Sequence, residues 1–486
     1  TYSDKGFNAM SRNMHDFVRK HIVRGQWQYK ERPVLLNSWE AAYFDISERK
    51  LYELAKAGHD VGIELFVMDD GWFGNRDDDS SSLGDWYVNK KKLPNGLKGI
   101  CDKINALGMS FGIWVEPEML NVNSDLYRLH PDWAMDIPGC AHSEGRNQRI
   151  LDLCNPEVTE YIIDSMTKVF SSANIDYVKW DMNRIFSDYY SKYLKAQGRP
   201  QGETAHRYMM ALGRIMRTLT ERFPHILFEG CAAGGNRFDL GILCYFPQIW
   251  ASDNTDAVSR AYIQEGLSYG YPMSTVSAHV SVCPNHQTLR VTPLSTRFNV
   301  AAFGICGYEC NLVDMSRAER SEIKTQIDIY KKWRHAMQFG SFYRQRTGNI
   351  HQWTVVDEEA GRAVGLIMQE LVRANTQNEE YYAAGLDPEA VYSFYNRPLK
   401  HNVKEFGDLI NTVAPIHIRQ GSLLHGMVAK FVTMPGETEK YELSGSMLMN
   451  CGVRLKQAFA ATGFSEEVRH FPDFASRLYF MEKISD

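Results

Sequence analysis

The sequence lacks the short motifs that usually mark metal, nucleotide and disulfide-rich proteins. It contains no Cys-x-x-Cys, His-Glu-x-x-His or His-x-His motif, and no Gly-x-Gly-x-x-Gly or phosphate loop. The nine cysteines are scattered, and the closest pair, Cys306 and Cys310, has no second pair at metal-ligand spacing. We therefore expect neither a structural zinc site nor a disulfide framework, and a reducing compartment fits this cysteine usage.

Long apolar runs and an excess of basic charge are also missing. No segment approaches 18 uninterrupted apolar residues, so the sequence predicts no membrane span. The formal net charge is −5 and no long basic run occurs, so nothing favours nucleic acid as a partner. The chain begins at Thr1, and no signal-like segment follows.

The overall amino-acid composition is typical of a large globular enzyme. Hydrophobic residues make up 44% and charged residues 23% of the 486 residues, which allows a large core and suggests two or three domains. Aromatic residues reach 12%. Sugar-binding clefts use aromatic faces, but large cores do as well, so this enrichment alone decides nothing.

Short apolar runs alternate with helical patterns through most of the chain. One predicted helix covers 47–58 with Ser47 as its N-cap, a second is opened by Asn155-Pro156, and a third covers 206–223. The predicted strands are 34–39, 64–70, 110–116, 175–181, 226–231, 248–252, 272–278 and 299–305. Eight such units predict a (β/α)8 barrel over 33–344, after a leading segment 1–32. A doubly wound open sheet is the competing fold, but no strand is followed by a nucleotide-binding loop.

The pattern changes after the barrel. Residues 351–356 and 363–368 flank an Asp-Glu-Glu-Ala-Gly-Arg turn and predict a hairpin. Further short β-like runs are 391–395, 414–418 and 477–481. We therefore expect a separate C-terminal antiparallel β-sandwich over 345–486.

Charged residues gather at the ends of the predicted barrel strands, where such barrels carry their chemistry. Lys179 and Asp181 end the fourth strand and project to the same face, because strand positions two apart share a face. A structural ion pair between these two residues is the simpler interpretation. Asp253 ends the sixth strand, so it can face Asp181 across the barrel. Glycoside cleavage requires two carboxylates, and these two lie at the open end of a barrel whose sequence contains no metal motif.

Several other strand-end residues have ordinary structural interpretations. Trp72 is typical of core, and one of Glu116 and Glu118 is more typical of a structural carboxylate than of a catalytic one. His279 and His286 are most often loop hydrogen-bonders. Cys231 alone would most often be a buried, inert thiol.

Taken together, the motifs resemble those of the bacterial α-galactosidases of glycoside hydrolase family 36. The resemblance covers nearly the whole chain. It is carried by S-W-E (38–40), L-F-V-M-D-D-G-W-F-G (65–74), G-D-W-Y-V-N-K-K-K-L-P-N-G-L-K-G (84–99), F-G-I-W-V-E-P-E-M (111–119), G-R-N-Q (145–148), Y-V-K-W-D-M-N-R (177–184), F-E-G-C (228–231), G-G-N-R-F-D (234–239), Q-I-W-A-S-D-N-T-D-A (248–257) and S-A-H-V-S-V-C-P-N-H-Q (277–287).

The resemblance implies a retaining exo-α-galactosidase that acts on melibiose- or raffinose-type oligosaccharides without metal or cofactor. Asp181 matches the nucleophile and Asp253 the acid/base of a double displacement. Asp69 and Asp70 match the pair that binds the 4- and 6-hydroxyls of galactose. The remaining matches are the sugar-positioning residues Trp114, Arg146 and Lys179, and the contacts near the 2-position, Cys231 and Gly234. The resemblance also implies a cytoplasmic bacterial protein and a possible homo-oligomer.

The chain departs from the family pattern in two ways. Many members read Cys-Ser-Gly-Gly-Gly-Gly-Arg-Phe-Asp where this chain reads Cys231-Ala-Ala-Gly-Gly-Asn236-Arg-Phe-Asp. That loop lies near the 2-substituent, so an α-N-acetylgalactosaminidase is the close alternative. Full-length relatives also carry an N-terminal β-sandwich, which we expect this chain to lack. A galactosyl transferase and a non-catalytic α-galactoside-binding remnant are therefore further hypotheses.

Overall fold

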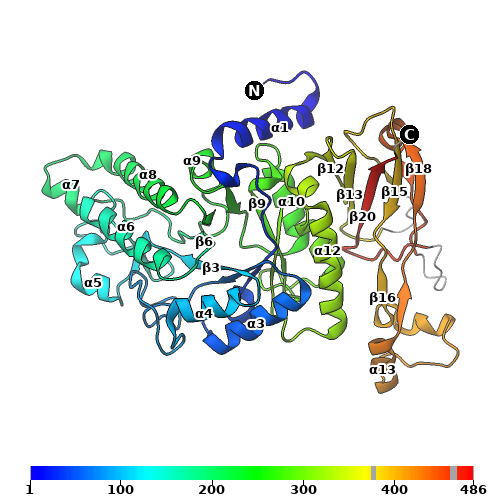
Figure 1. The fold of residues 1–486 in the computed structure, drawn as a ribbon, viewed down its shortest axis with the longest axis horizontal. Helices are drawn as coiled ribbons and strands as arrows, with labels where there is room; N and C mark the ends of the chain where they lie inside the picture. The colour runs from blue at the N-terminus through cyan, green and yellow to red at the C-terminus, as the bar shows by residue number, and fades with distance from the viewer. Residues whose placement is uncertain (1, 374–378, 460–467, 485–486) are drawn as a thin grey trace.

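The computed structural model describes residues 2–373, 379–459 and 468–484. Figure 1 shows a barrel surrounded by helices, and beside it a β-domain that ends the chain. Within the described residues, no helix combines the length and the apolar character that a membrane span needs.

Eight parallel strands close into a barrel in the order β1-β10-β9-β8-β7-β6-β3-β2. This confirms the predicted TIM-type barrel. The strands are β1 (Leu35–Asn37), β2 (Leu65–Met68), β3 (Ser110–Val115), β6 (Tyr177–Trp180), β7 (Leu227–Gly230), β8 (Gln248–Trp250), β9 (Val276–Ser281) and β10 (Ile305–Glu309).

Two of the predicted strands are misplaced. The sequence predicts the eighth strand over 299–305, but α11 (Leu294–Ala301) takes up the start of this run and the strand begins only at Ile305. A short apolar run can belong to a buried helix or to a buried strand, and here the end of a helix is followed by the start of a strand. The seventh strand, predicted over 272–278, starts at Val276 because Met273–Thr275 forms a 3-10 turn, η5. His279 therefore lies inside β9 and not in a loop.

Helices cover the outside of the barrel, and the predicted caps form. The Ser47 hydroxyl accepts a hydrogen bond from the Lys50 N–H at the start of α3, and Asn155 accepts one from the Glu157 N–H at the start of α6. The main helices are α1 (Gly6–Phe17), α3 (Glu48–Val61), α4 (Gly96–Asn105), α6 (Pro156–Ser171), α8 (Thr204–Arg222), α10 (Ala257–Leu267) and α12 (Arg317–Phe339). Shorter helices are α2 (Trp39–Ala42), α5 (Asp125–Leu129), α7 (Lys192–Ala196) and α9 (Leu240–Leu243).

The C-terminal part is an antiparallel sheet domain, as predicted. Its six strands run in the order β11 (Ser341–Thr347), β12 (Ile350–Asp357), β13 (Arg362–Gln369), β20 (Ser476–Lys483), β15 (Val391–Asn396) and β18 (Lys440–Ser444). The predicted hairpin is β12–β13. Because the sheet begins at Ser341, residues 341–344, which the sequence placed in the barrel, belong to the sheet.

Smaller elements accompany both parts of the chain. Three two-stranded pairs are β14 (Glu380–Tyr381) with β19 (Val453–Arg454), β16 (Lys400–Asn402) with β17 (Thr433–Pro435), and, in the barrel, β4 (Met119–Asn121) with β5 (Gln148–Ile150). The predicted strand 414–418 is wrong: this segment is irregular and connects η6 (Val403–Thr412) to α13 (Leu423–Phe431). Its apolar residues suggested burial, but Ile416 is 59% exposed.

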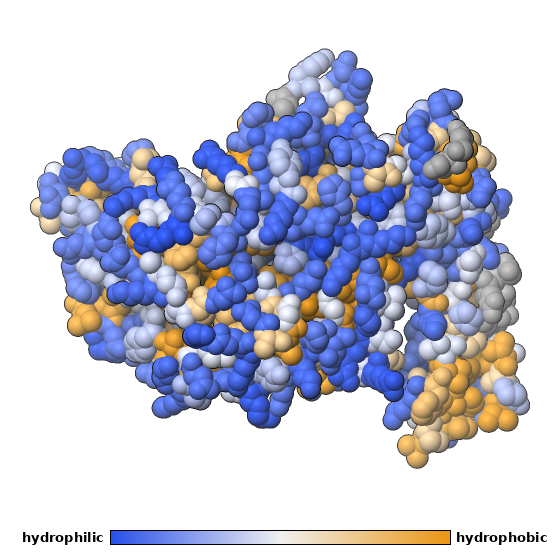
Figure 2. All heavy atoms as spheres, in the orientation of Figure 1, coloured by the Kyte–Doolittle hydropathy of each residue, from blue (hydrophilic) through white to orange (hydrophobic). Residues whose placement is uncertain are grey.

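The surface is largely hydrophilic in the view of Figure 2, apart from an apolar region on the projection that carries α13. Leu423 and Phe431 are 91% and 87% exposed. Of the residues in α13, His425 alone is buried. The described part of the chain therefore leaves the apolar side of this helix uncovered.

The barrel and the sheet domain are joined by a buried imidazole between two carboxylates. The Nδ1 of His351 in β12 lies 2.8 Å from Glu265 Oε1 in α10, and its Nε2 lies 3.0 Å from Glu370 Oε1. Burial lowers the pKa of His351, but these two carboxylates outweigh it and raise the pKa above its ordinary value. With a carboxylate at each ring nitrogen, the imidazolium donates both hydrogen bonds.

We expect the replacement His351→Gln to destabilise the protein by about 3 kcal/mol at pH 6, because it leaves two carboxylates without their cation. The folded-state pKa lies above the unfolded value of about 6.5, so the contribution is complete below that pH and is lost as the pH rises through the folded-state pKa. The difference in melting temperature between wild type and variant should therefore shrink toward pH 9. His335→Gln, at an exposed position, is the control, and an equal difference at both pH values would contradict the assignment.

Candidate active site

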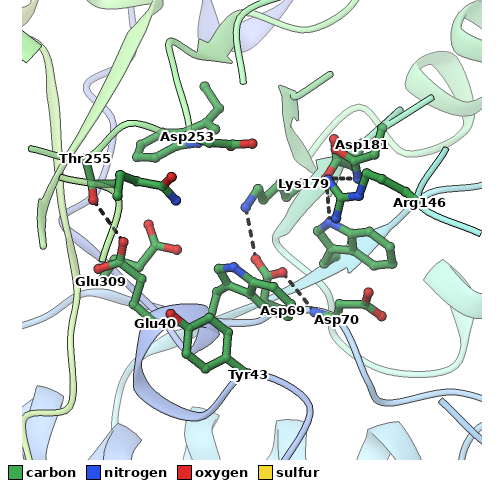
Figure 3. Close-up of a pocket in the computed structure, with 15 residues that line it drawn as sticks. Glu40, Tyr43, Asp69, Asp70, Arg146, Lys179, Asp181, Asp253, Thr255 and Glu309 are labelled. Carbon is green, nitrogen blue, oxygen red and sulfur yellow. Dashed lines mark hydrogen bonds and ion pairs between the residues drawn. The ribbon is translucent and has the colours of Figure 1, made fainter. Parts of the chain in front are cut away.

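The carboxyl ends of the barrel strands surround a pocket of about 310 Å³. Ligand sites of this size lie at the lower end of the usual range and suit a single sugar ring. Figure 3 shows the pocket and its polar walls. The lining residues are Trp39, Glu40, Tyr43, Asp69, Asp70, Trp114, Arg146, Lys179, Asp181, Asn183, Trp250, Asp253, Thr255, Gln287 and Glu309.

Asp181 follows β6, and three donors hold its carboxylate. Its Oδ2 accepts hydrogen bonds from Trp114 Nε1 at 3.1 Å and Asn183 Nδ2 at 2.7 Å. Its Oδ1 accepts one from the Met182 N–H at 2.9 Å. Three donors from different parts of the chain fix the direction of this carboxylate.

Lys179 does not pair with Asp181, which was the simpler interpretation of the sequence. Its ammonium lies 3.1 Å from Asp69 Oδ2 at the end of β2 (Figure 3). Burial opposes the charge, but Asp69 and the other carboxylates around the pocket raise the pKa of Lys179 well above its ordinary value. Lys179 and Asp181 still project into the same pocket, as their spacing predicted.

Asp69 and Asp70 have different partners. Asp69 accepts hydrogen bonds from Asn37 Nδ2 at 2.8 Å and from the Asp70 N–H at 2.9 Å. Asp70 forms a buried ion pair with Arg76, with Nη2 2.8 Å from Oδ2. Burial raises the pKa of Asp70 above its ordinary value, and the Arg76 charge limits that rise. The two carboxylates therefore reach the pocket with fixed orientations.

Asp253 lies on the segment after β8. Trp250 Nε1 donates a hydrogen bond to its Oδ1 at 3.0 Å. Burial of the carboxyl between the pocket walls, followed by the charge of Asp181, raises the pKa of Asp253, although the residue keeps one side open to solvent. A carboxyl with a raised pKa suits proton donation.

Cys231 and Gly234 do not line the pocket but lie directly behind its wall. The Cys231 thiol is buried, and burial together with the charge of Asp181 raises its pKa well above the ordinary value. Gly234 has a φ of 82°, and a Cβ there would lie 2.8 Å from the Asp253 backbone nitrogen. This loop therefore supports the segment that carries Asp253. Arg146 does line the pocket, from a loop in which it adopts a φ of 52°.

Glu309 is the main site residue that the sequence did not reveal. It ends β10, so the sequence interpretation, which placed the eighth strand at 299–305, did not reach it. The available signal was the apolar run that starts at Ile305 and ends in the charged Glu309. Burial raises its pKa to about 8, and the nearby Lys179 opposes this shift. Its Oε2 lies 2.9 Å from Nδ1 of His279, whose pKa burial lowers to about 3.

Glu40, a strand-end residue in the sequence, lies beside Glu309 in the pocket wall (Figure 3), because β1 and β10 are neighbouring strands. Burial, followed by the charge of Glu309, raises the pKa of Glu40 to about 7. Its Oε1 accepts a hydrogen bond from the Thr255 hydroxyl at 2.9 Å. Asn183, Thr255, Tyr43 and Gln287 also line the pocket and were not expected there, since loop residues carry no strand-end signal.

Glu116 and Glu118 stay outside the pocket lining. Glu118 binds both terminal nitrogens of Arg237, at 2.6 and 2.8 Å; burial opposes the Glu118 charge, but Arg237 holds the pKa below its usual range. Glu116 accepts a hydrogen bond from the Asn183 N–H at 2.5 Å. Burial and the charge of Asp181 raise the pKa of Glu116 to about 8. Both residues position the loops around Asp181 from behind.

The comparisons with known proteins agree with this geometry. Residues 1–340 match the Melibiase family, and residues 350–481 match the glycosyl hydrolase family 36 C-terminal domain. The chain belongs to the melibiase family.

Several members of the family are close relatives. The chain is 49% identical over 394 residues to the α-galactosidase AgaA of Geobacillus stearothermophilus, a match that covers 80% of this chain and 54% of AgaA. It is 46% identical over 393 residues to the α-galactosidase Mel36A of Lactobacillus acidophilus, covering 80% of this chain and 53% of that protein. The chain thus spans about half the length of the curated relatives it matches.

Solved structures of the family show the same fold. A structure of AgaA from G. stearothermophilus in complex with raffinose superimposes with a TM-score of 0.85 at 41% identity, covering 100% of this chain and 60% of that one. The α-galactosidase from Lactobacillus brevis gives a TM-score of 0.86 at 38% identity and covers 100% and 59%.

We expect the replacement Gly234→Ala to lower the free energy of unfolding by about 1–3 kcal/mol, because it combines a left-handed φ with a backbone clash at Asp253. Thermal melting measures this loss. Gly266→Ala is the matched control, since a Cβ at Gly266 in α10 meets no atom within 4 Å. Equal melting temperatures for the two variants would contradict a supporting role for Gly234.

Proposed function

We propose that the chain is a retaining exo-glycosidase that hydrolyses terminal non-reducing α-D-galactosides by double displacement. The observation that carries this proposal is the pocket itself, in which Asp181 and Asp253 line one sugar-sized space together with the pair Asp69 and Asp70. The names of the relatives support it, as do the related structures in complex with raffinose and stachyose.

In the first step, Asp181 attacks the anomeric carbon as the nucleophile. The bond to the leaving oxygen breaks while the protonated carboxyl of Asp253 gives that oxygen its proton. The product is a covalent galactosyl-enzyme on Asp181. The donors Trp114, Asn183 and the Met182 N–H aim the Asp181 carboxylate, so little reorganisation is needed during the attack.

In the second step, Asp253 acts as a base. Its carboxylate takes a proton from water, and the water oxygen attacks the anomeric carbon and releases Asp181. Two inversions give net retention. The raised pKa of Asp253 serves both steps, because the group must be protonated at the start and must accept a proton later.

The sugar hydroxyls have partners of fixed direction. Asp69 and Asp70 accept hydrogen bonds from the 4- and 6-hydroxyls, and Lys179, Arg146 and Trp114 position the ring. The ion pair with Arg76 holds the Asp70 carboxylate in place. Carboxylates that already have oriented partners discriminate an axial from an equatorial 4-hydroxyl by whether its hydrogen bond can form.

The loop of Cys231 and Gly234 bears on the 2-substituent. The Ala233 N–H donates a hydrogen bond to Asn183 Oδ1 at 3.0 Å, so the loop is tied to a residue that itself holds Asp181. We propose galactose as the preferred sugar, in melibiose- or raffinose-type oligosaccharides. A higher kcat/KM on aryl α-N-acetylgalactosaminide than on aryl α-galactoside would assign the acetamido sugar instead.

The assembly and location of the protein are also proposals. Homo-oligomerisation follows from the family resemblance. A cytoplasmic location is consistent with the nine cysteines, all of which are free thiols.

We expect Asp181→Asn to lower kcat on an aryl α-galactoside by at least about 10³-fold, because the nucleophile is lost. Asp253→Asn should lower kcat/KM on raffinose by about 10²–10⁴-fold, because a poor leaving group needs the proton. Asp60→Asn, at an exposed position of α3, is the control.

A fluorinated galactosyl inactivator should add one galactosyl unit to Asp181, as intact mass and peptide mapping can show. Galactose binding without labelling would favour the non-catalytic remnant.

The replacement Trp250→Phe should raise the pKa of Asp253 further, because the indole N–H stabilises the carboxylate form. The alkaline limb of the pH profile of kcat/KM, on which the acid loses its proton, should move up by about one pH unit. Trp114→Phe is the comparison, since it removes a donor to Asp181 and should leave the alkaline limb in place. A stationary alkaline limb in Trp250→Phe would argue against Asp253 as the acid.

A further inference from the structure

Two histidines and a glutamate meet in the sheet domain, away from the barrel pocket. His401 lies in β16, Glu405 in the first turn of η6, and His470 on the segment that leads to β20. One ligand atom from each of the three lies within 4.8 Å of the other two. The cluster borders a cavity of about 480 Å³ between the sheet domain and the barrel, whose opposite wall includes Pro293 and Glu322.

The two distances from Glu405 to the imidazoles are close to those between ligand atoms around a tetrahedral metal ion, and the two imidazole nitrogens lie within 4.8 Å of each other. His401 Nδ1 lies 3.3 Å and His470 Nε2 lies 3.6 Å from the same oxygen, Glu405 Oε2. Zinc–nitrogen and zinc–oxygen bonds of about 2.0–2.1 Å place neighbouring ligand atoms about 3.3–3.4 Å apart in a tetrahedron. The two imidazole planes cross at 80°, so their lone pairs approach the carboxylate oxygen from different directions.

Hydrogen bonding within the chain explains the cluster less well. Charge-assisted N–H···O bonds measure about 2.7–2.9 Å, and both contacts to Glu405 are longer. The second nitrogen of each ring, His401 Nε2 and His470 Nδ1, is buried and has no hydrogen-bond partner among the residues that the structure describes. Three polar side chains are thus gathered closely, but one long hydrogen bond, between His401 and Glu405, is the pairing that joins them in the described part of the chain.

The carboxylate is oriented from behind. Glu405 Oε1 accepts a hydrogen bond from the Asn402 N–H at 2.9 Å, in the capping box that starts η6. This leaves Oε2 to face both imidazoles. A ligating carboxylate is usually held by such an outer hydrogen bond.

The donor atoms also suit a cation. Two imidazole nitrogens and one carboxylate oxygen form a donor set that zinc accepts readily.

We propose that His401 Nδ1, Glu405 Oε2 and His470 Nε2 bind one Zn²⁺ ion. The fourth coordination position faces the cavity, where water completes the tetrahedron. The ion ties the start of η6 to the segment before β20, two parts of the sheet domain that are distant in the sequence. The sequence contained no zinc motif because the third ligand is brought in only by folding. The site is independent of the glycosidase reaction, to which no metal contributes in the mechanism above.

Zinc titration of the chelator-treated 486-residue chain tests the site. We expect calorimetry to show one saturable site per chain, and a higher melting temperature in the presence of Zn²⁺, because an ion bound to the folded state stabilises it. His401→Gln and His470→Gln should each weaken zinc binding by more than the roughly 10–100-fold that loss of an outer-sphere partner costs. His59→Gln, an exposed histidine of α3, is the control and should bind as wild type does.

X-ray absorption at the zinc edge keeps the test valid even if a variant folds poorly, because it uses the wild-type chain. The expected spectrum shows two imidazoles and oxygen donors in four-coordination. Absence of a saturable site, coordination by other ligands, or an equal loss of affinity in His59→Gln would overturn the proposal. Hydrolysis of an aryl α-galactoside should be the same before and after chelation, so a failure of the zinc site and a failure of the proposed function are separable.

Discussion

The buried ammonium of Lys179 is the interaction on which the pocket depends. It stands between the ends of β2 and β6 and contacts Asp69, while Asp181 and Glu309 lie near enough to raise its pKa. Several carboxylates could not share so small a space without a cation, because each charge would oppose the next. Lys179 therefore balances the charge of the site and at the same time holds one of the sugar-binding acids in place.

The carboxylates around Lys179 divide into two kinds according to their surroundings. Asp181 has three hydrogen-bond donors, whereas Glu40 and Glu309 are buried with few donors and their pKa values rise to about 7 and about 8. Glu116 and Glu118 lie behind the pocket lining and anchor the loops around Asp181. These two carboxylates support the site, whereas the carboxylates that line the pocket carry its chemistry.

Most of the barrel could be predicted because its strands are continuous apolar runs flanked by capped helices, as Ser47 and Asn155 show. The prediction failed where helix and strand follow one another in a single apolar run, at α11 and β10, and it missed Glu309 for that reason. It failed again at 414–418, an irregular segment in which Ile418 is buried but Ile416 stays on the surface. In each case the run had the composition of a strand, and only packing decided which residues were buried.

The sequence by itself determined the eight-unit barrel, the following sheet domain, and the acids at the strand ends, because periodicity and the position of a charge after an apolar run are local properties. It also placed Lys179 and Asp181 on one face. The tertiary structure decided their partners: Lys179 pairs with Asp69 of another strand, and Asp181 with Trp114 and Asn183. It likewise brought His470 to His401 and Glu405. Pairings of this kind depend on the closure of the barrel and the folding of the sheet, which join residues distant in the chain and leave no local pattern.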